Sequence, residues 1–391
     1  MSVTAPRGFR AAAVASGVKP EGLDLAVVCA DGAGPAAAVF TTNRAQAAPV
    51  LVSREHLAAG CARAVVVNAG CANAATGETG LADAREMAAA TARALGCAAA
   101  EVAVASTGVI GVRLPMAKVL SGIPRAVADL AVGGGAAAAR AILTTDTKAE
   151  EVAVEVPLSS GSVRIGGMAK GAGMIAPRMA TMLAFLTTDA VIDPALLQRG
   201  LREAVGESLN RITVDGDTST NDMALILSSG LGGTVARGRD YDAFRDGLVT
   251  ATRRIAEMIV RDGEGATRIA EVRVEGAASE ADADAIARTI AESPLVKTAL
   301  HGGDPNWGRI LAAAGRAGVS FDVKGIDIRI GDVWVAEGGA AREYDESLAA
   351  AAMREDPVLL RVCLREGDAS SWLWTTDLSH GFVDVNAHYR S

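Results

Sequence analysis

The chain has 391 residues and a formal net charge of −8, and 50% of its residues are hydrophobic although only 3% are aromatic. The acidic balance argues against nucleic acid or an anionic membrane surface as a partner, and no apolar run reaches the about 18 residues of a membrane-spanning helix. The five cysteines are widely spaced, the four histidines are scattered, and the N-terminus lacks the apolar core of a signal peptide. We therefore expect a cytoplasmic protein with reduced thiols, no disulfide framework and no metal site.

The first half of the chain is predicted to mix short strands with helices. Runs rich in β-branched residues mark strands at 25–29, 37–41, 64–68 and 102–105, and the rest of residues 1–80 is expected to form loops. Apolar residues at helical spacing predict a helix at 80–95, which Gly96 can close, and two helices within 116–143 on either side of three glycines. Alternating residues then predict a hairpin of 151–156 with 162–165.

The second half continues the same mixture. Helices are predicted at 194–209 and 240–260, and a third should begin at Ser279, where Asp282 completes a capping box and Pro294 ends the apolar stripe. Strands are predicted at 270–275, 326–330, 333–335, 358–364 and 371–374. Because strands and helices do not alternate strictly, we expect an α/β fold of the α+β type, with sheets packed between helix layers rather than a Rossmann fold.

Two motifs suggest a dinucleotide-binding site and a calcium site, but the residues around them do not support either. Gly32-Ala-Gly34-Pro-Ala-Ala37 fits the dinucleotide fingerprint G-x-G-x-x-A, but Pro35 lies inside the turn and the following residues are poor helix formers. The acidic stretch from Thr213 to Asp222 resembles a calcium loop but lacks the required glycine-to-glutamate spacing. We interpret it as a polar loop that organises turns or an active site.

The segment that follows Lys170 is the most informative part of the chain. Glycines lead to Ala180 and Thr181 and then to an apolar run. By itself this pattern favours a buried strand entered through a glycine turn. It also suits self-cleavage, in which the Thr181 hydroxyl attacks the Ala180 carbonyl. The new N-terminal amine, with a reference pKa of about 7.7–8.0, could then act as the base for that hydroxyl.

Dense polar clusters elsewhere decide between these interpretations. The clusters are Asn68-Ala-Gly-Cys-Ala-Asn-Ala-Ala-Thr-Gly77, Ser106-Thr-Gly-Val-Ile-Gly111, Thr144-Thr-Asp-Thr-Lys148, Asp262-Gly-Glu-Gly-Ala-Thr267, Gly303-Asp-Pro-Asn-Trp-Gly-Arg309 and Asn386-Ala-His-Tyr-Arg-Ser391. In this order, and together with Lys170-Gly-Ala-Gly-Met, Met179-Ala-Thr-Met-Leu183 and Asp215-Gly-Asp-Thr-Ser-Thr-Asn221, they make the chain resemble the ornithine acetyltransferase family of arginine biosynthesis. The resemblance extends from residue 40 to residue 391.

The resemblance implies an N-terminal-nucleophile-like sandwich that cuts itself between Ala180 and Thr181. The products would be an α chain, 1–180, and a β chain, 181–391, assembled as two α and two β chains. Thr181 would take the acetyl group from N2-acetyl-L-ornithine and pass it to L-glutamate, with ping-pong kinetics. The Thr107 hydroxyl and the Gly108 N–H would form the oxyanion hole. No cofactor is implied, and acetyl-CoA stays open as a co-substrate.

The resemblance also assigns substrate-binding residues by their motifs. They are Thr147, Lys170, Thr181, Glu264, Asn386 and Ser391. The residue types suit amino-acid substrates, because a lysine can hold a carboxylate and a glutamate can hold an ammonium group. The chain differs from the family pattern at Ala69 and Ala75, where serine and cysteine are common.

Two other functions remain open. A self-processed amidase or aminopeptidase would use the same Thr181 with water as the acceptor, and would release acetate or cleave peptides without glutamate. A non-catalytic small-molecule-binding protein would never cut itself and would leave its ligand unchanged.

Overall fold

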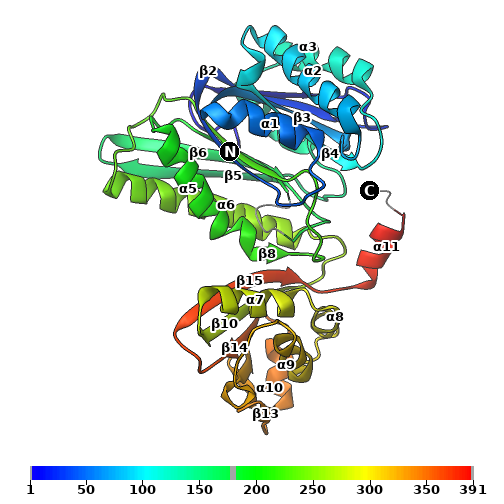
Figure 1. Ribbon diagram of the computed structural model, residues 1–391, viewed down its shortest axis with the longest axis vertical. Helices are drawn as coiled ribbons and strands as arrows, with labels where there is room; N and C mark the ends of the chain where they lie inside the picture. The colour runs from blue at the N-terminus through cyan, green and yellow to red at the C-terminus, as the bar shows by residue number, and fades with distance from the viewer. Residues whose placement is uncertain (1, 177–181, 389–391) are drawn as a thin grey trace. The chain divides into compact units, whose positions relative to one another are not determined.

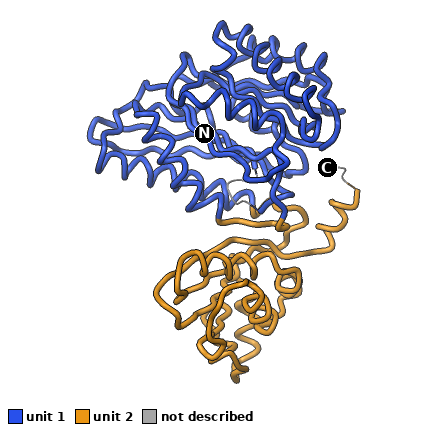
Figure 2. The backbone as a smooth tube through the Cα atoms, in the orientation of Figure 1, with its two compact units in different colours: residues 1–210, 217–259, 391 blue, residues 211–216, 260–390 orange. Residues whose placement is uncertain are grey.

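The computed structural model describes residues 2–176 and 182–388. The chain divides into two compact units (Figure 2). The first unit comprises the described residues of Met1–Asn210 and Asp217–Ile259, and the second those of Arg211–Gly216 and Val260–Arg390. Among the described residues, no helix is both long and apolar enough to cross a membrane.

The first unit contains one eight-stranded mixed sheet and six α-helices (Figure 1). Its strands are β1 (Phe9–Val14), β2 (Leu25–Phe40), β3 (Cys61–Cys71), β4 (Val102–Val109), β5 (Glu150–Leu158), β6 (Gly161–Lys170), β7 (Leu183–Thr188) and β9 (Met223–Ser228). Its helices are α1 (Ala48–His56), α2 (Gly77–Leu95), α3 (Met116–Ala128), α4 (Gly135–Ala141), α5 (Pro194–Gly206) and α6 (Arg239–Arg261). The strand order is β4-β3-β2-β9-β7-β6-β5, and β1 pairs with β2.

The long strand β2 joins the two arms of this sheet. Its first part pairs with β3 and its last five residues pair with β9. Alternate side chains of a strand point to opposite faces. Leu25 and Val27 therefore join a core with α1, α2 and α3, whereas Val28 joins a core with Phe185 of β7 and Leu225 of β9. The two arms thus pack against each other across a shared apolar core.

Helices cover the outer face of each arm. The helices α1–α3 lie over β2, β3 and β4, whereas α5 packs against the last part of β2 and α6 lies along β5 and β6 (Figure 1). Gln198 of α5 bonds to both backbone groups of Ala38 in β2, and Gly247 of α6 lies against Val156 and Ile165 of the β5–β6 hairpin. The layers therefore run helix, sheet, sheet, helix, which confirms the predicted sheets between helix layers and excludes a Rossmann fold.

The second unit contains a seven-stranded sheet of order β13-β12-β11-β14-β10-β15-β8. Its strands are β8 (Ile212–Thr213), β10 (Ile269–Ala277), β11 (Asp327–Ile330), β12 (Val333–Glu337), β13 (Ala340–Ala341), β14 (Val358–Cys363) and β15 (Ala369–Thr376). Its helices are α7 (Glu280–Ala291), α8 (Pro294–Gly302), α9 (Trp307–Gly315), α10 (Glu346–Ala352) and α11 (His380–His388). Residues of α7–α10 form one core with the apolar residues of the strands. The Ser279 hydroxyl caps α7 by accepting from the Asp282 N–H at 3.1 Å, as predicted.

Several element predictions were wrong, and the errors have physical reasons. Residues 1–80 were expected to hold no helix, but α1 lies there; its N-cap, Ala47, makes no side-chain cap bond. The helices α8–α11 were also missed, because each has only seven to nine residues, which is too short to display a clear helical period. The expected strands 25–29 and 37–41 are parts of one strand, β2. The dinucleotide-like motif therefore lies inside a strand, where a Cβ on Gly34 would overlap the Ser228 carbonyl of β9.

Candidate active site

The residues predicted to form the oxyanion hole lie at the end of β4. Thr107 faces Ala69 of β3, and Gly108 faces Gly70. Gly108 has a φ of 127°, and a Cβ on it would overlap the backbone of Gly70 and Cys71. Only glycine combines this backbone angle with so close an approach of a neighbouring strand. The close approach fixes the direction of the peptide groups on either side of Gly108.

Buried amide side chains hold this strand end in place. The Ser106 hydroxyl donates to Asn68 Oδ1 at 2.6 Å, and Asn68 Nδ2 donates to the Cys71 carbonyl at 2.9 Å. From the far side, Asn221 Nδ2 donates to the carbonyls of Ala72 at 2.6 Å and Ser106 at 2.9 Å. The polar loop before β9 is therefore bonded to the end of β4.

Lys170 ends β6 and lies inside a buried ionic cluster. Its Nζ donates to the Thr144 hydroxyl at 2.6 Å and lies 3.2 Å from Asp146 Oδ2. Asp146 also accepts from the N–H groups of Thr144 at 2.7 Å and Gly171 at 2.6 Å. Asp146 thus ties the start of the glycine segment to the loop after α4. The predicted residue Thr147 follows Asp146 on that loop and is exposed.

The cluster keeps Asp146 charged. Burial raises the pKa of this carboxyl, but the Lys170 ammonium and the hydrogen bonds from Thr144 outweigh burial, so that the net pKa lies below the usual value. The sequence placed Asp146 in a polar cluster without assigning it a role. The hairpin predicted from the sequence includes neither Asp146 nor Lys170, so that their contact became visible only in the tertiary structure.

Asp222 is a second buried carboxyl near the glycine segment. It is 2% exposed, and its Oδ2 has no hydrogen-bond partner among the described residues. Burial raises the pKa of Asp222 well above its usual value, although hydrogen bonds from Ser219, Thr41 and the Met182 N–H and the charge of Lys170 act in the opposite direction. The buried Asp222 carboxyl therefore lies beside the Met182 N–H in surroundings that favour its protonated form.

The second unit brings together two other predicted residues. Asn386 Nδ2 of α11 donates to Glu264 Oε2 at 2.8 Å. The loop that carries Glu264 is anchored by Asp377, which accepts from the Thr267 hydroxyl at 2.6 Å and lies 2.7 Å from His301 Nδ1. The hydrogen bonds from Thr267 contribute to a pKa of Asp377 below the usual value, against the effect of burial. The sequence predicted Glu264 and Asn386 but missed this anchor.

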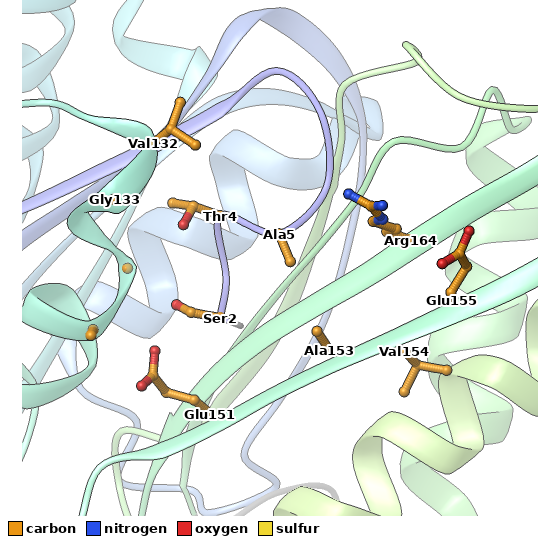
Figure 3. A pocket seen from close by; sticks show the side chains of 12 residues that line it. Ser2, Thr4, Ala5, Val132, Gly133, Glu151, Ala153, Val154, Glu155 and Arg164 are labelled. Carbon is orange, nitrogen blue, oxygen red and sulfur yellow. The ribbon is translucent and has the colours of Figure 1, made fainter.

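Three predicted residues lie outside the described part of the chain. They are Ala180, Thr181 and Ser391. A pocket of about 540 Å³ in the first unit lies elsewhere, between the N-terminal segment, the turn before α4 and the β5–β6 hairpin (Figure 3). Glu151 and Arg164 line it, but none of the predicted site residues does.

The four layers of the first unit place the chain in the class of mixed α/β sandwich proteins, and the buried ammonium–carboxylate cluster and the strand end at Gly108 lie within that unit. The chain belongs to the ArgJ family, whose family model matches residues 10–391. The protein of Chlorobaculum tepidum called "Arginine biosynthesis bifunctional protein ArgJ" is 48% identical over 389 residues, which are 99% of this chain and 96% of that protein. The resemblance predicted from the motifs is thereby confirmed.

Two solved structures are similar as well. The ArgJ crystal structure from Bacillus halodurans is 43% identical with a TM-score of 0.52, and the match covers 54% of this chain and 100% of that chain. The ornithine acetyltransferase of Mycobacterium tuberculosis, solved with ornithine, is 49% identical with a TM-score of 0.44 over 46% of this chain and 96% of that chain.

Proposed function

We propose that this chain is a self-cleaving glutamate N-acetyltransferase of arginine biosynthesis, which moves the acetyl group of N2-acetyl-L-ornithine to L-glutamate. The observation that carries the proposal is membership of the ArgJ family over residues 10–391. The buried cluster of Lys170, Thr144 and Asp146 at the start of the glycine segment supports it. A catalytic apparatus needs charged groups held in fixed positions in this way.

The chemistry begins with self-cleavage. The Thr181 hydroxyl attacks the Ala180 carbonyl, so that the C–N bond breaks, an ester forms and the nitrogen becomes a free amine. Water then hydrolyses the ester and leaves a carboxylate on Ala180. The released amine of Thr181 can accept the hydroxyl proton in the transfer reaction, as in other N-terminal threonine nucleophiles.

Acetyl transfer then takes two steps. Thr181 attacks the acetyl carbonyl of N2-acetylornithine, ornithine leaves with a proton on its α-nitrogen, and acetyl-Thr181 remains. The α-amine of glutamate attacks this ester in turn and regenerates Thr181. Each tetrahedral intermediate carries a negative oxygen, which the Thr107 hydroxyl and the Gly108 N–H stabilise. The glycine-only geometry at Gly108 supports its part in this assignment.

The remaining predicted residues bind the substrates. Thr147, Lys170, Glu264, Asn386 and Ser391 form this set. Glu264 and Asn386 are hydrogen-bonded to each other, so that the amide orients the carboxylate. No cofactor takes part, and acetyl-CoA is a candidate second acetyl donor. Adding labelled acetyl-CoA and glutamate without acetylornithine tests this second activity, since only a dual-donor enzyme would form labelled N-acetylglutamate.

The two chains after cleavage are 1–180 and 181–391, assembled as two α and two β chains in the cytoplasm. The match to the Bacillus halodurans chain supports the position of the cut, because it covers all of that chain and 54% of this one. That share of 391 residues is about 211 residues, the length of 181–391. The five cysteines are all free thiols, which fits a reducing compartment.

Mass spectrometry of the purified protein under denaturing conditions tests the cleavage. We expect two masses that fit 1–180 and 181–391, and one uncut, inactive chain for Thr181→Ala. Thr181→Ser should still cut in part, because it keeps a hydroxyl. A Thr181→Ala protein that runs as two chains would exclude Thr181 as the nucleophile.

An assay of acetyl exchange then separates the alternatives. A transferase forms N-acetylglutamate and releases no acetate when glutamate is absent. An amidase or aminopeptidase releases acetate or cleaves peptides without glutamate. A binding protein stays uncut and leaves acetylornithine unchanged.

A further inference from the structure

The loop before β2 holds the backbone of Lys19 in a fixed position. Asp24 is fully buried, and its carboxylate accepts hydrogen bonds from the N–H groups of Ser16 at 2.6 Å, Gly17 at 2.9 Å and Lys19 at 3.0 Å. The Ser16 hydroxyl adds a fourth bond at 2.7 Å. Four bonds to one buried carboxylate fix the backbone of this loop. The direction in which the Lys19 side chain leaves the loop is therefore fixed as well.

The Lys19 side chain lies between the two groups of predicted residues in the first unit. Its Cγ lies 2.8 Å from the place where a Cβ of Gly70 would be, and Gly70 faces Gly108 at the end of β4. At its other end, Lys19 Nζ donates to the carbonyl of Leu143 at 3.2 Å, directly before the loop that carries Asp146. The side chain of Lys19 thus runs from beside the strand end that carries Gly108 to the residue before the loop of the ionic cluster.

Lys19 differs from Lys170 in how its charge is satisfied. Lys170 is almost fully buried, and the hydrogen bond to Thr144 and the ion pair with Asp146 use two of its three donors. A further carboxylate, that of Glu150, lies within 4.8 Å of the Asp146 carboxylate. By contrast, the hydrogen bond of the half-buried Lys19 Nζ goes to a neutral carbonyl. Among the contacts of the described residues, Lys19 therefore keeps more bonding capacity for a ligand than Lys170 does.

The electrostatic setting of Lys19 favours an anionic ligand. Burial lowers the pKa of Lys19, and the charge of Lys170 lowers it further, against the opposing effect of Asp24 and Asp146. A bound carboxylate would raise the pKa of Lys19, because it stabilises the ammonium form.

We propose that the Lys19 ammonium binds the α-carboxylate that N2-acetylornithine and glutamate have in common. This inference rests on the proposed function. In a ping-pong exchange both substrates place their α-nitrogen at the same acetyl carbon, so their α-carboxylates occupy one place near the oxyanion hole. Their side chains differ in charge, because ornithine ends in an ammonium group and glutamate in a carboxylate. Only the α-carboxylate offers Lys19 the same partner in both half-reactions.

Paired substrates and variants test the contact. The acetyl donors are N2-acetylornithine and its α-carboxamide, which lacks the negative charge. We expect Lys19→Met to lower kcat/KM for N2-acetylornithine by about 10- to 100-fold, the range of a hydrogen bond between charged groups. For the carboxamide the same substitution should change kcat/KM less than threefold. A merely structural role would lower both values alike.

Two further variants complete the design. Lys19→Arg keeps the charge and should retain the preference for the carboxylate over the carboxamide. Lys118→Met is the matched control, because Lys118 Nζ donates to the Gly17 carbonyl of the same loop at 2.6 Å but is exposed. It should behave as the wild type does. If Lys19→Met does not fold, loss of the carboxylate preference in a folded Lys19→Gln protein replaces it as the readout.

The outcomes separate this inference from the proposed function. Suppose that the wild type exchanges acetyl groups, and that replacing N2-acetylornithine by its α-carboxamide lowers kcat/KM equally in the wild type and in Lys19→Met. This result would overturn the role of Lys19 but not the proposed function. A wild-type enzyme that transfers no acetyl group between ornithine and glutamate would overturn the proposed function itself.

Discussion

The residues of the candidate site are constrained by their immediate neighbours. Gly108 has no room for a side chain, and the buried side chains of Asp146 and Lys170 form an ion pair with each other. Breaking such a pair leaves a buried charge without a partner, which costs about 3–5 kcal/mol. These positions therefore tolerate little change, whatever their part in the reaction.

At Thr107 a substitution can test catalysis without disturbing the fold. Thr107 lies at the end of β4 and is half-buried, so Thr107→Ala should leave the fold intact. We expect kcat to fall by about 10²-fold or more if its hydroxyl stabilises the oxyanion. Steady-state kinetics on cleaved protein measure the effect, and Thr250→Ala on the exposed face of α6 is the matched control. A rate close to that of the wild type would remove Thr107 from the mechanism.

At the scale of elements, the sequence predicted those with strong local signals. The capping box at Ser279 and the alternation in β5 and β6 gave elements of the right type at nearly the right positions. The short helices α8 to α11 were missed because their stability comes from tertiary packing rather than from a repeating apolar pattern. One of them, α8, illustrates this dependence through a single buried lysine.

Lys297 attaches α8 to the end of β15. Its Nζ donates to the hydroxyls of Thr375 at 3.1 Å and Thr376 at 3.0 Å, and burial lowers its pKa to about 8. Because the unfolded chain holds this proton up to a pKa near 10.5, the wild type should gain stability as the pH rises from about 8 to 10.5.

Chemical denaturation across this pH range measures the slope. We expect Lys297→Met to lose this gain, because it removes the titrating group, while the exposed Lys324→Met keeps it. Equal slopes for the wild type and Lys297→Met would show that the pKa of Lys297 is not depressed in the folded protein.

At the scale of the whole molecule, the predicted cut falls between two paired strands. β6 ends at Lys170, and β7 begins at Leu183 and pairs with β6 along its length. β7 and β9 both follow the cut, and β9 also pairs with β2, which precedes it. Residues before and after position 180 therefore share one sheet and one apolar core.

This arrangement predicts that the cleaved chains stay together. Size-exclusion chromatography under native conditions should give a single peak that contains both 1–180 and 181–391, and only denaturant should separate them. The uncut Thr181→Ala protein is the control and should elute at the same volume. Separation of the two chains without denaturant would contradict the shared sheet.

The sequence alone determined the class of fold, most of the long elements, and the motifs that identify the family, since each of these depends on local spacing and residue type. It also identified Thr107, Gly108 and Lys170 as candidates. The tertiary structure alone decided which charges meet. The loop before β5 brings Asp146 to Lys170 at the end of β6, and the bonds to Asp24 fix the backbone of Lys19, whose Nζ donates to the Leu143 carbonyl. Contacts between residues far apart in the chain arise from strand register and packing, which no local pattern encodes.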